Sequence, residues 1–344
     1  MQELFQLVRR LVDIPSVSGG EGRCGEFLAA WLEAAGFRVD LQEVSPGRLN
    51  VAAACGRPEV VLSTHMDTVG PFFASGEDSE WITGRGSCDA KGILAAQLVA
   101  ARELKQAGLS DFGLLFVVGE ETVSDGARAA NASSPGSRFV IVGEPTGNRL
   151  VAATKGILQV RLRARGRAAH SAYPDRGESA IEKLLDVLAD LRAMPLPRDP
   201  ELGPTTMNIG LLSGGVAPNV TPPEAEATAL FRTVTGPESL VAQIDQVVAG
   251  RAEIEVVRAG GPTRMVRLDG FEADVVAFTT DVPHLDRWGR PLLVGPGSIL
   301  RAHSAEERIA KAELVRAVEL YRQLVVHLKA SDPAGARAPE GARP

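Results

Sequence analysis

The sequence is poor in features that define several common protein classes. Only three cysteines occur in 344 residues, Cys24, Cys55 and Cys88, and no two of them have the CxxC spacing. Their scarcity argues against a disulfide framework and against a zinc site made of thiolates. No stretch approaches the roughly 20 apolar residues of a membrane span. Basic residues form no stripe that could neutralise phosphates, and the formal net charge is −6, so nucleic acid is not an expected partner.

The composition and the two ends of the chain indicate a folded protein of the cytoplasm. Hydrophobic residues make up 44% and charged residues 23%, as in ordinary globular proteins with a sizeable core. Residues 1–20 read as an amphipathic helix that stops at Ile14–Pro15, without the basic head and unbroken apolar run of a signal peptide. Residues 331–344 are rich in proline, glycine and alanine, which predicts a disordered tail.

Short apolar runs alternate with helical segments in the first part of the chain. Residues 59–65, 112–120 and 138–144 are strand-like, and each run leads into an acid or a histidine. Helical periodicity covers residues 21–37 and 92–108. Such alternation predicts an α/β sheet covered by helices on both faces. Because ligands of these sheets gather at the carboxyl ends of strands, the three strand ends are the expected place for a site.

A different pattern begins after Lys155–Gly156. Residues 157–264 follow the order strand, helix, strand, strand, helix, strand, which is the ferredoxin-like pattern. The α/β pattern resumes at Asp274 and continues into a helix predicted over residues 305–329. The sequence therefore predicts one catalytic domain made of residues 1–156 and 265–330, with the ferredoxin-like unit inserted into it.

Acids and histidines at the predicted strand ends and in glycine-rich turns form the candidate site. Taken singly, each has an ordinary explanation: a helix cap for an aspartate, a satisfied core position for a histidine, a solvated turn for paired glutamates. Their joint occurrence favours a shared site. Two imidazoles with several carboxylates suit zinc, cobalt or manganese, and suit copper(I) or iron–sulfur clusters poorly. The candidates are His65, Asp67, Asp89, Glu120, Glu121, Glu144 and His303.

Five ordered motifs carry a resemblance to a known family. They are HMDTV, GRGSCDAKG, the glutamate pair, GEPT, and GPGSI followed by AH. Together they resemble the M20 family of dinuclear metallohydrolases, which includes acetylornithine deacetylase, succinyl-diaminopimelate desuccinylase, aminoacylase and glutamate carboxypeptidase. The resemblance runs from the first helix to about residue 330. It implies an α/β, zinc-exopeptidase-like catalytic domain with helices on both faces of a mixed sheet, and an inserted ferredoxin-like α+β lid.

The resemblance also implies a ligand set for two divalent ions per chain. Zinc is the expected metal, with cobalt or manganese as alternatives. By resemblance, His65 and Glu144 bind one ion, Glu121 and His303 bind the other, and Asp89 bridges them. A shared anion fits this arrangement physically, because it offsets the repulsion of two cations about 3.5–4 Å apart.

Within the same resemblance Glu120 is the general base. Since successive side chains on a strand point to opposite sides, we expect the strand end to direct Glu121 to a metal and Glu120 to the substrate. Asp67 lies two residues after His65 and is expected to accept the imidazole N–H, fixing its tautomer. The resemblance further implies a cis peptide bond at Asp89–Ala90.

The lid adds a second group of expected site residues. By resemblance, His170 reaches the active site of a partner subunit in a homodimer and donates to the developing oxyanion. Arg232 and Asn219 are expected to hold the substrate's carboxylate, and Gly297 to lie against the substrate. Leu230 stands where family members often have an acid, which leaves the orientation of Arg232 open.

These features together predict an enzyme that removes the acyl group from an N-acyl amino acid, with N-acetylornithine in arginine biosynthesis as the specific expectation. Alternatives with the same chemistry are a dipeptidase or carboxypeptidase, a succinyl-amino-acid desuccinylase, and a hydrolase that frees lysine or ornithine from a carrier protein. A catalytically inactive metal-binding homologue is a rival of another class, and the presence of Glu120 argues against it. A cysteine hydrolase using Cys88 is a further, disfavoured alternative.

Overall fold

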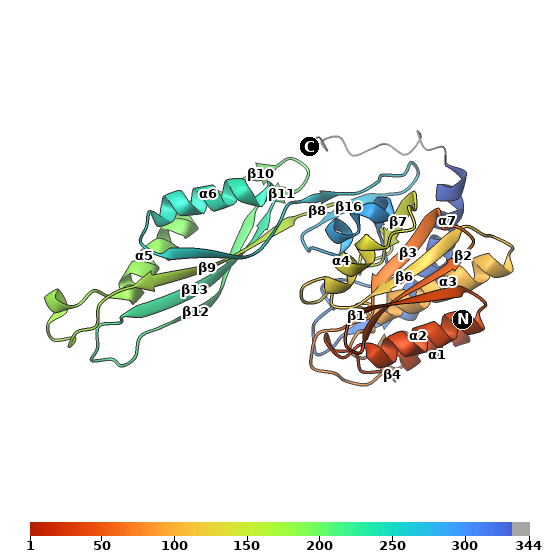
Figure 1. The fold of residues 1–344 in the computed structure, drawn as a ribbon, viewed down its shortest axis with the longest axis horizontal. Coiled ribbons are helices and arrows are strands. Elements are labelled where there is room, and N and C mark those ends of the chain that lie inside the picture. The colour runs from red at the N-terminus through yellow and green to blue at the C-terminus, as the bar shows by residue number, and fades with distance from the viewer. Residues whose placement is uncertain (332–344) are drawn as a thin grey trace. The chain divides into compact units, whose positions relative to one another are not determined.

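A mixed sheet of six strands forms the centre of the larger of two separately packed units (Figure 1). The computed structural model describes residues 1–331. The larger unit contains Met1–Ala152, Met265–Asp274 and the described chain from Thr280, and the other contains Ala153–Arg264 and Val275–Thr279. The tail predicted to be disordered lies outside the described residues, apart from Ser331.

The first unit's sheet has antiparallel strands at one side and parallel strands at the other. β1, β2 and β6 pair antiparallel, whereas β6, β3, β7 and β17 pair parallel. Every residue of β3, β6 and β7 is buried, which explains their continuous apolar sequences. In sheet order the strands are β1 (Arg38–Ser45), β2 (Arg48–Cys55), β6 (Phe112–Val117), β3 (Val60–His65), β7 (Phe139–Val142) and β17 (Arg290–Leu293).

Helices lie on both faces of this sheet, as the sequence predicted. One face packs Leu62 and Leu114 into a core shared with four helices. On the other face a shorter helix, α4, is fixed by the Trp288 indole, which donates to the carbonyl oxygen of Ala130 at 3.0 Å. The four helices that share this core are α1 (Gln2–Val12), α2 (Gly22–Ala34), α3 (Lys91–Gln106) and α7 (Lys311–Ala330), and α4 spans Asp125–Ala132.

The last helix begins later than the sequence predicted. Residues 305–329 were expected to be helical, but α7 starts at Lys311. The segment before it, β18 (Arg308–Ala310), instead pairs antiparallel with β5 (Trp81–Thr83). Strand pairing with a distant segment therefore overrides the local helical pattern at this point.

The second unit is the ferredoxin-like fold that the sequence predicted. Its four strands are antiparallel in the order β12-β13-β9-β14, and two helices cover one face. Leu158, Val160 and Phe231 are fully buried in the resulting core. The elements in chain order are β9 (Gly156–Arg165), α5 (Ala180–Ala193), β12 (Thr206–Gly214), β13 (Glu224–Thr233), α6 (Pro237–Val248) and β14 (Glu253–Gly260).

Short elements complete the described chain. None of the helices in residues 1–331 is long and apolar enough to cross a membrane. All three cysteines are free. The remaining strands are β4 (Gly76–Glu77), β8 (Leu150–Thr154), β10 (Arg198–Asp199), β11 (Gly203–Pro204), β15 (Thr263–Arg264) and β16 (Ala273–Val276), and the 3-10 turns are η1 (Pro174–Arg176), η2 (Val282–His284) and η3 (Asp286–Trp288).

Candidate metal centre and active site

Three neighbouring strands bring candidate residues to one edge of the first unit's sheet. β3 runs parallel to both β6 and β7, so their carboxyl ends lie together. His65 is the last residue of β3 and pairs with Val117, the last residue of β6. The glutamate pair follows Val117 by three residues, and Glu144 follows β7 by two.

Asp89 lies between the two candidate histidines. It is buried in the loop that precedes α3. Its Oδ1 is 3.0 Å from His65 Nε2, and its Oδ2 is 3.4 Å from His303 Nε2. Burial alone would raise the pKa of Asp89, but hydrogen bonds from both histidines hold it well below its usual value. The peptide bond Asp89–Ala90 is cis, as the resemblance implied.

Glu121 completes the cluster around Asp89. Its Oε1 lies 2.9 Å from His303 Nε2, and hydrogen bonds to Asp89 and Glu121 raise the pKa of His303 to about 10. Ligand atoms of His65, Asp89 and Glu121 all lie within 4.8 Å of one another. Residues 65, 89, 121 and 303 thus converge from four separate segments of the chain.

Glu120 and Glu144 add negative charge to the same place. Burial raises the pKa of Glu120 well above its usual value, and the nearby charge of Asp281 raises it further. Burial, followed by the charge of Glu120, likewise raises the pKa of Glu144. Asp281 was not among the residues expected from the sequence, because it lies in no motif and follows a threonine pair rather than an apolar run.

This donor set fits a divalent cation. Imidazole nitrogens and carboxylate oxygens are the usual ligands of zinc in catalytic sites. The raised pKa values of Glu120 and Glu144 indicate that two histidines do not balance the negative charge at the site. A bound cation would stabilise the ionised carboxylates that burial otherwise disfavours.

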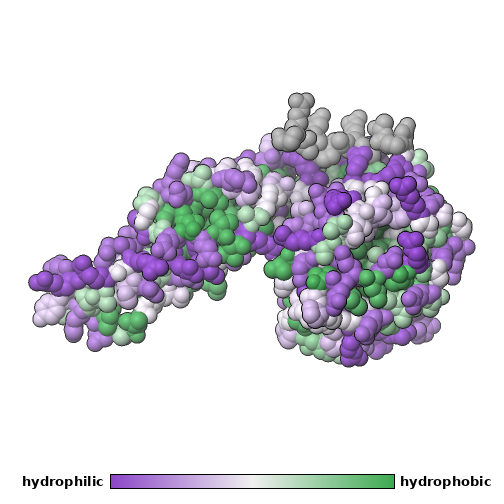
Figure 2. Space-filling view, in the orientation of Figure 1, coloured by the Kyte–Doolittle hydropathy of each residue, from purple (hydrophilic) through white to green (hydrophobic). Residues whose placement is uncertain are grey.

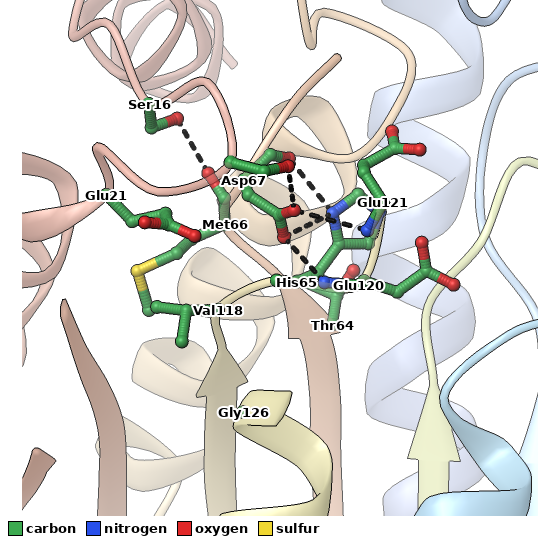
Figure 3. A network of polar contacts seen from close by, with 12 residues as sticks. Ser16, Glu21, Thr64, His65, Met66, Asp67, Val118, Glu120, Glu121 and Gly126 are labelled. Carbon is green, nitrogen blue, oxygen red and sulfur yellow. Dashed lines mark hydrogen bonds and ion pairs between the residues drawn. The ribbon is translucent and has the colours of Figure 1, made fainter. Parts of the chain in front are cut away.

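Asp67 connects His65 to the glutamate pair (Figure 3). The backbone carbonyl oxygen of Asp67 lies 3.0 Å from His65 Nδ1, whereas the side-chain Oδ1 of Asp67 lies 3.5 Å from the same nitrogen. The carboxylate accepts the backbone N–H groups of Glu120 at 3.1 Å and Glu121 at 3.2 Å, and the hydroxyl of Ser18 at 2.7 Å. The imidazole of His65 is therefore contacted by the backbone of Asp67 as well as by the expected carboxylate. The carboxylate of Asp67 also accepts hydrogen bonds from the turn that carries the two glutamates.

The glutamate pair is oriented by this turn rather than by strand alternation. β6 ends at Val117, so Glu120 and Glu121 lie beyond the strand and the alternation of side chains does not apply to them. Gly119 has a φ of 75°, and a Cβ there would meet Asp125 Oδ1 at 2.0 Å, so the turn requires glycine at this position. Our expectation about the direction of the two side chains thus rested on the wrong local geometry.

Two polar side chains from β2 anchor the same turn at its ends. Asn50 accepts the N–H of Val118 at 3.1 Å and donates to the carbonyl oxygen of Gly126 at 2.8 Å. Arg48 donates to the carboxylate of Asp125 at 2.5 Å, and it also donates to the buried Glu21. These contacts hold the segment that carries the glutamates on both sides.

The second unit places its expected site residues at the two ends of its sheet. His170 forms an isolated β-bridge with Val220, the residue that follows Asn219. These residues lie in loops outside β13, near the end of that strand where Glu224 begins it. Arg232 lies near the other end of β13, where its Nη1 donates to the Thr279 hydroxyl at 3.4 Å. Eight residues of extended strand span roughly 26 Å. Within one chain, His170 and Asn219 are therefore far from Arg232.

Gly297 and Cys88 pack against each other. Gly297 has a φ of 87°, and a Cβ there would meet the Cys88 sulfur at 2.5 Å. The thiol donates to the carbonyl oxygen of Ser298 at 3.6 Å. Burial, followed by the charges of Asp89 and Glu307, raises the pKa of Cys88 well above its usual value. A thiol that stays protonated is a poor nucleophile, which argues against a cysteine hydrolase.

Comparison with known proteins gives the family. A family model described as "Peptidase dimerisation domain", of the M20 type, matches residues 152–255. A peptidase M20 domain-containing protein of Schizosaccharomyces pombe is 38% identical over 338 aligned residues, covering 94% of this chain and 84% of that protein. A probable carboxypeptidase of Aspergillus clavatus is 37% identical over 364 aligned residues, covering 94% of this chain and 88% of that protein.

Solved structures share the fold at lower identity. Aminopeptidase PepT from Bacillus cereus superposes with a TM-score of 0.80 at 22% identity, over 95% of this chain and 98% of that chain. YXEP from Bacillus subtilis, a dinuclear metal binding peptidase from the M20 family, has a TM-score of 0.70 at 16% identity, over 96% of this chain and 99% of that chain. The chain belongs to the M20 peptidase family. It is a metallopeptidase-type hydrolase that acts on peptide or amide bonds.

Proposed function

We propose that this chain hydrolyses an amide bond whose amine half carries a free carboxylate. This class of substrates includes N-acetylornithine, the substrate expected from the sequence. It also includes dipeptides and short peptides that are cleaved at their last peptide bond. The observation that carries the proposal is the convergence of His65, Asp89, Glu121 and His303 beside the half-buried Glu120. The carboxypeptidase name of the Aspergillus relative supports the peptide form of the substrate.

We assign the metal ligands as the resemblance implied. His65 and Glu144 would hold one divalent ion, Glu121 and His303 a second, and Asp89 both, with zinc as the expected metal. The contacts of Asp89 support the bridging role, because its two oxygens already face different histidines. When bound, such a pair of ions polarises the amide carbonyl and lowers the pKa of a water molecule.

Glu120 is assigned as the general base. Its carboxylate takes a proton from the attacking water and delivers it to the leaving nitrogen, while the amide C–N bond breaks and the water oxygen stays on the acyl carbon. Its backbone is fixed through Asp67, and its side chain forms no hydrogen bond to any residue in the described chain. A base with no competing protein partner is available to water and substrate.

Arg232 is assigned to the substrate's carboxylate. Its guanidinium is partly buried, and burial followed by the charge of Arg258 lowers its pKa. In residues 1–331 no carboxylate forms an ion pair with Arg232, although most arginines on this sheet do have such partners. An anionic ligand would supply the missing partner, and a planar guanidinium matches a carboxylate well.

The lid residues support a homodimer. Because His170 and Asn219 lie at the opposite end of β13 from Arg232, one substrate would contact all three only if two chains contribute. Edge strand β12 exposes Leu211 and Leu212 by 69% and 57%, and Figure 2 shows apolar patches on the second unit. Pairing with a second copy would cover this edge.

Three free cysteines in the chain agree with a reducing compartment, so we retain the cytoplasm as its location.

The experiment compares substrates that differ only in the carboxylate. The zinc-loaded protein is assayed with N-acetyl-L-ornithine, N-succinyl amino acids and dipeptides, each beside its C-terminal amide. We expect the best substrate to lose at least about 100-fold in kcat/KM when its carboxylate becomes an amide, since the guanidinium is then left unpaired. Equal turnover of acid and amide forms would contradict the proposal. The ranking of acids separates deacetylase, desuccinylase and carboxypeptidase activities.

A further inference from the structure

A buried acid outside the expected ligand set contacts the loop that carries Asp89. Glu307 is 1% exposed. Its Oε1 accepts the backbone N–H groups of Cys88 at 3.1 Å and Asp89 at 3.0 Å. Its Oε2 accepts a hydrogen bond from Arg85 Nη1 at 2.7 Å. One carboxylate therefore holds the backbone of Asp89 and the side chain of an arginine three residues before Cys88.

Strand pairing brings Glu307 to this loop across 218 residues of sequence. β18 pairs with β5, with Arg308 opposite Thr83. Just beyond this pair, the N–H of Gly84 donates to the carbonyl oxygen of Glu307 at 3.1 Å. The Glu307 side chain then reaches over residues 84–90, which follow β5 and precede α3.

Arg85 is fixed independently of Glu307. It is 3% exposed, its Nε donates to the carbonyl oxygen of Pro71 at 3.2 Å, and its guanidinium carbon lies 4.9 Å from the centre of the Phe73 ring. A buried carboxylate needs a counter-charge, and Arg85 supplies it from a rigid position. The pair therefore presents Oε1 in a constant place to the two N–H groups.

We propose that Glu307 is a positioning residue for the metal centre. It holds the backbone at Asp89 so that the Asp89 carboxylate lies between His65 and His303. His303 is four residues before Glu307, so one short segment carries a candidate ligand and the anchor of another. The inference rests on the proposed function, since it assigns to Glu307 an effect on metal binding.

The same device occurs on the other ligand-bearing turn. The Asp67 carboxylate accepts the consecutive N–H groups of Glu120 and Glu121, as the Glu307 carboxylate accepts those of Cys88 and Asp89. Groups that hold ligands in place typically change metal affinity by about 10–100-fold when they are removed. An ion pair that served stability alone could be replaced by apolar side chains of similar size with little loss.

The test compares two double variants that differ in one acceptor. Arg85→Met/Glu307→Gln removes both charges but keeps an oxygen for the two N–H groups. Arg85→Met/Glu307→Leu removes both charges and the oxygen. Zinc affinity is measured by competition with a chromophoric chelator on the metal-free full chain. We expect the Leu variant to bind zinc about 10–100-fold more weakly than the Gln variant.

Controls separate positioning from general loss of stability. Thermal unfolding of the metal-free proteins reports on stability. The more exposed Arg138–Glu59 ion pair, just before the first residues of β7 and β3 and so away from the site, provides a control. Arg138→Met/Glu59→Leu should leave zinc affinity within about twofold of the parent, because it touches no ligand-bearing turn. Comparable affinity in the two Glu307 variants would overturn the inference even though the parent binds zinc. A parent chain that binds no divalent ion would overturn the proposed function and the inference together.

Discussion

Charged side chains crowd two regions of this protein: the outer face of the second unit's sheet and the strand-end site of the first unit. On the outer face acids and bases alternate, as where Arg163 donates to Glu226 at 2.7 Å and Arg161 to Glu255 at 3.0 Å. These side chains are partly exposed, from 31% to 49%. At the strand ends, by contrast, carboxylates are buried and outnumber the histidines beside them.

The difference indicates what each region is for. Exposed ion pairs on a sheet keep the face soluble and contribute little to stability. Buried acids without matching bases are costly, and the raised pKa values of Glu120 and Glu144 reflect that cost. A bound divalent cation would offset the cost of these unpaired acids.

The largest effect is expected at Glu120. Glu120→Gln should lower kcat by about 10²–10⁴ because it removes the proton acceptor and leaves the expected ligands in place. Elemental analysis of the same sample should give unchanged metal content. Its neighbour serves as the control, since Glu121→Gln should weaken metal binding. A Glu120→Gln enzyme as active as the parent would show that the mechanism assigned here is wrong.

His170 is expected to contribute the next largest effect. His170→Ala should lower kcat by about 10²–10³, as removal of one oxyanion donor does in other hydrolases, with metal content unchanged. In the proposed homodimer His170 would act on the site of a partner chain.

Subunit exchange tests that arrangement. Mixing Glu120→Gln with His170→Ala under exchange conditions should restore part of the activity, because one site of the heterodimer combines both native residues. Demonstrated exchange without recovery would mean that His170 does not act across an interface, and a protein monomeric at assay concentration would exclude that arrangement directly.

A smaller effect, on zinc affinity, is expected at Asp67, whose carboxylate accepts two N–H groups of the glutamate turn. Asp67→Asn can accept only one of the two N–H groups with its single oxygen, so zinc affinity should fall about 10–100-fold. Ser18→Ala is the matched control, because it removes one hydrogen bond to the same carboxylate and spares the turn. Chelator competition measures both. Equal affinities for Asp67→Asn and the parent would remove the positioning role of Asp67.

The smallest effect is expected on the outer face of the second unit. Glu226→Gln breaks ion pairs with Arg161 and Arg163, yet Tm should change by no more than about 3 °C, because solvent screens the exposed pairs. Metal content should stay at the parent value. A fall of more than about 10 °C in calorimetry would mean that this face contributes to stability after all.

The sequence allowed the fold and the converging residues to be predicted where local signals exist. His65 and Glu144 follow apolar runs, and Asp89 lies in a glycine-rich turn, so each is visible without coordinates. Asp281 and Glu307 were missed because no local pattern marks them. The contacts of Glu307 depend on the pairing of β18 with β5, which joins segments more than 200 residues apart. The same pairing explains why the last helix begins at Lys311 and not at residue 305 as predicted.

A count of metal ions in the parent and in Asp89→Ala tests the dinuclear metal centre most directly. Asp89 lies between both histidines, so we expect two divalent ions per parent chain and a large loss of metal in the variant. Elemental analysis after dialysis against a zinc buffer gives the number, and Glu226→Gln provides a folded comparison with both ions. A parent chain without bound ions, or an Asp89→Ala chain that keeps both, would contradict the dinuclear centre.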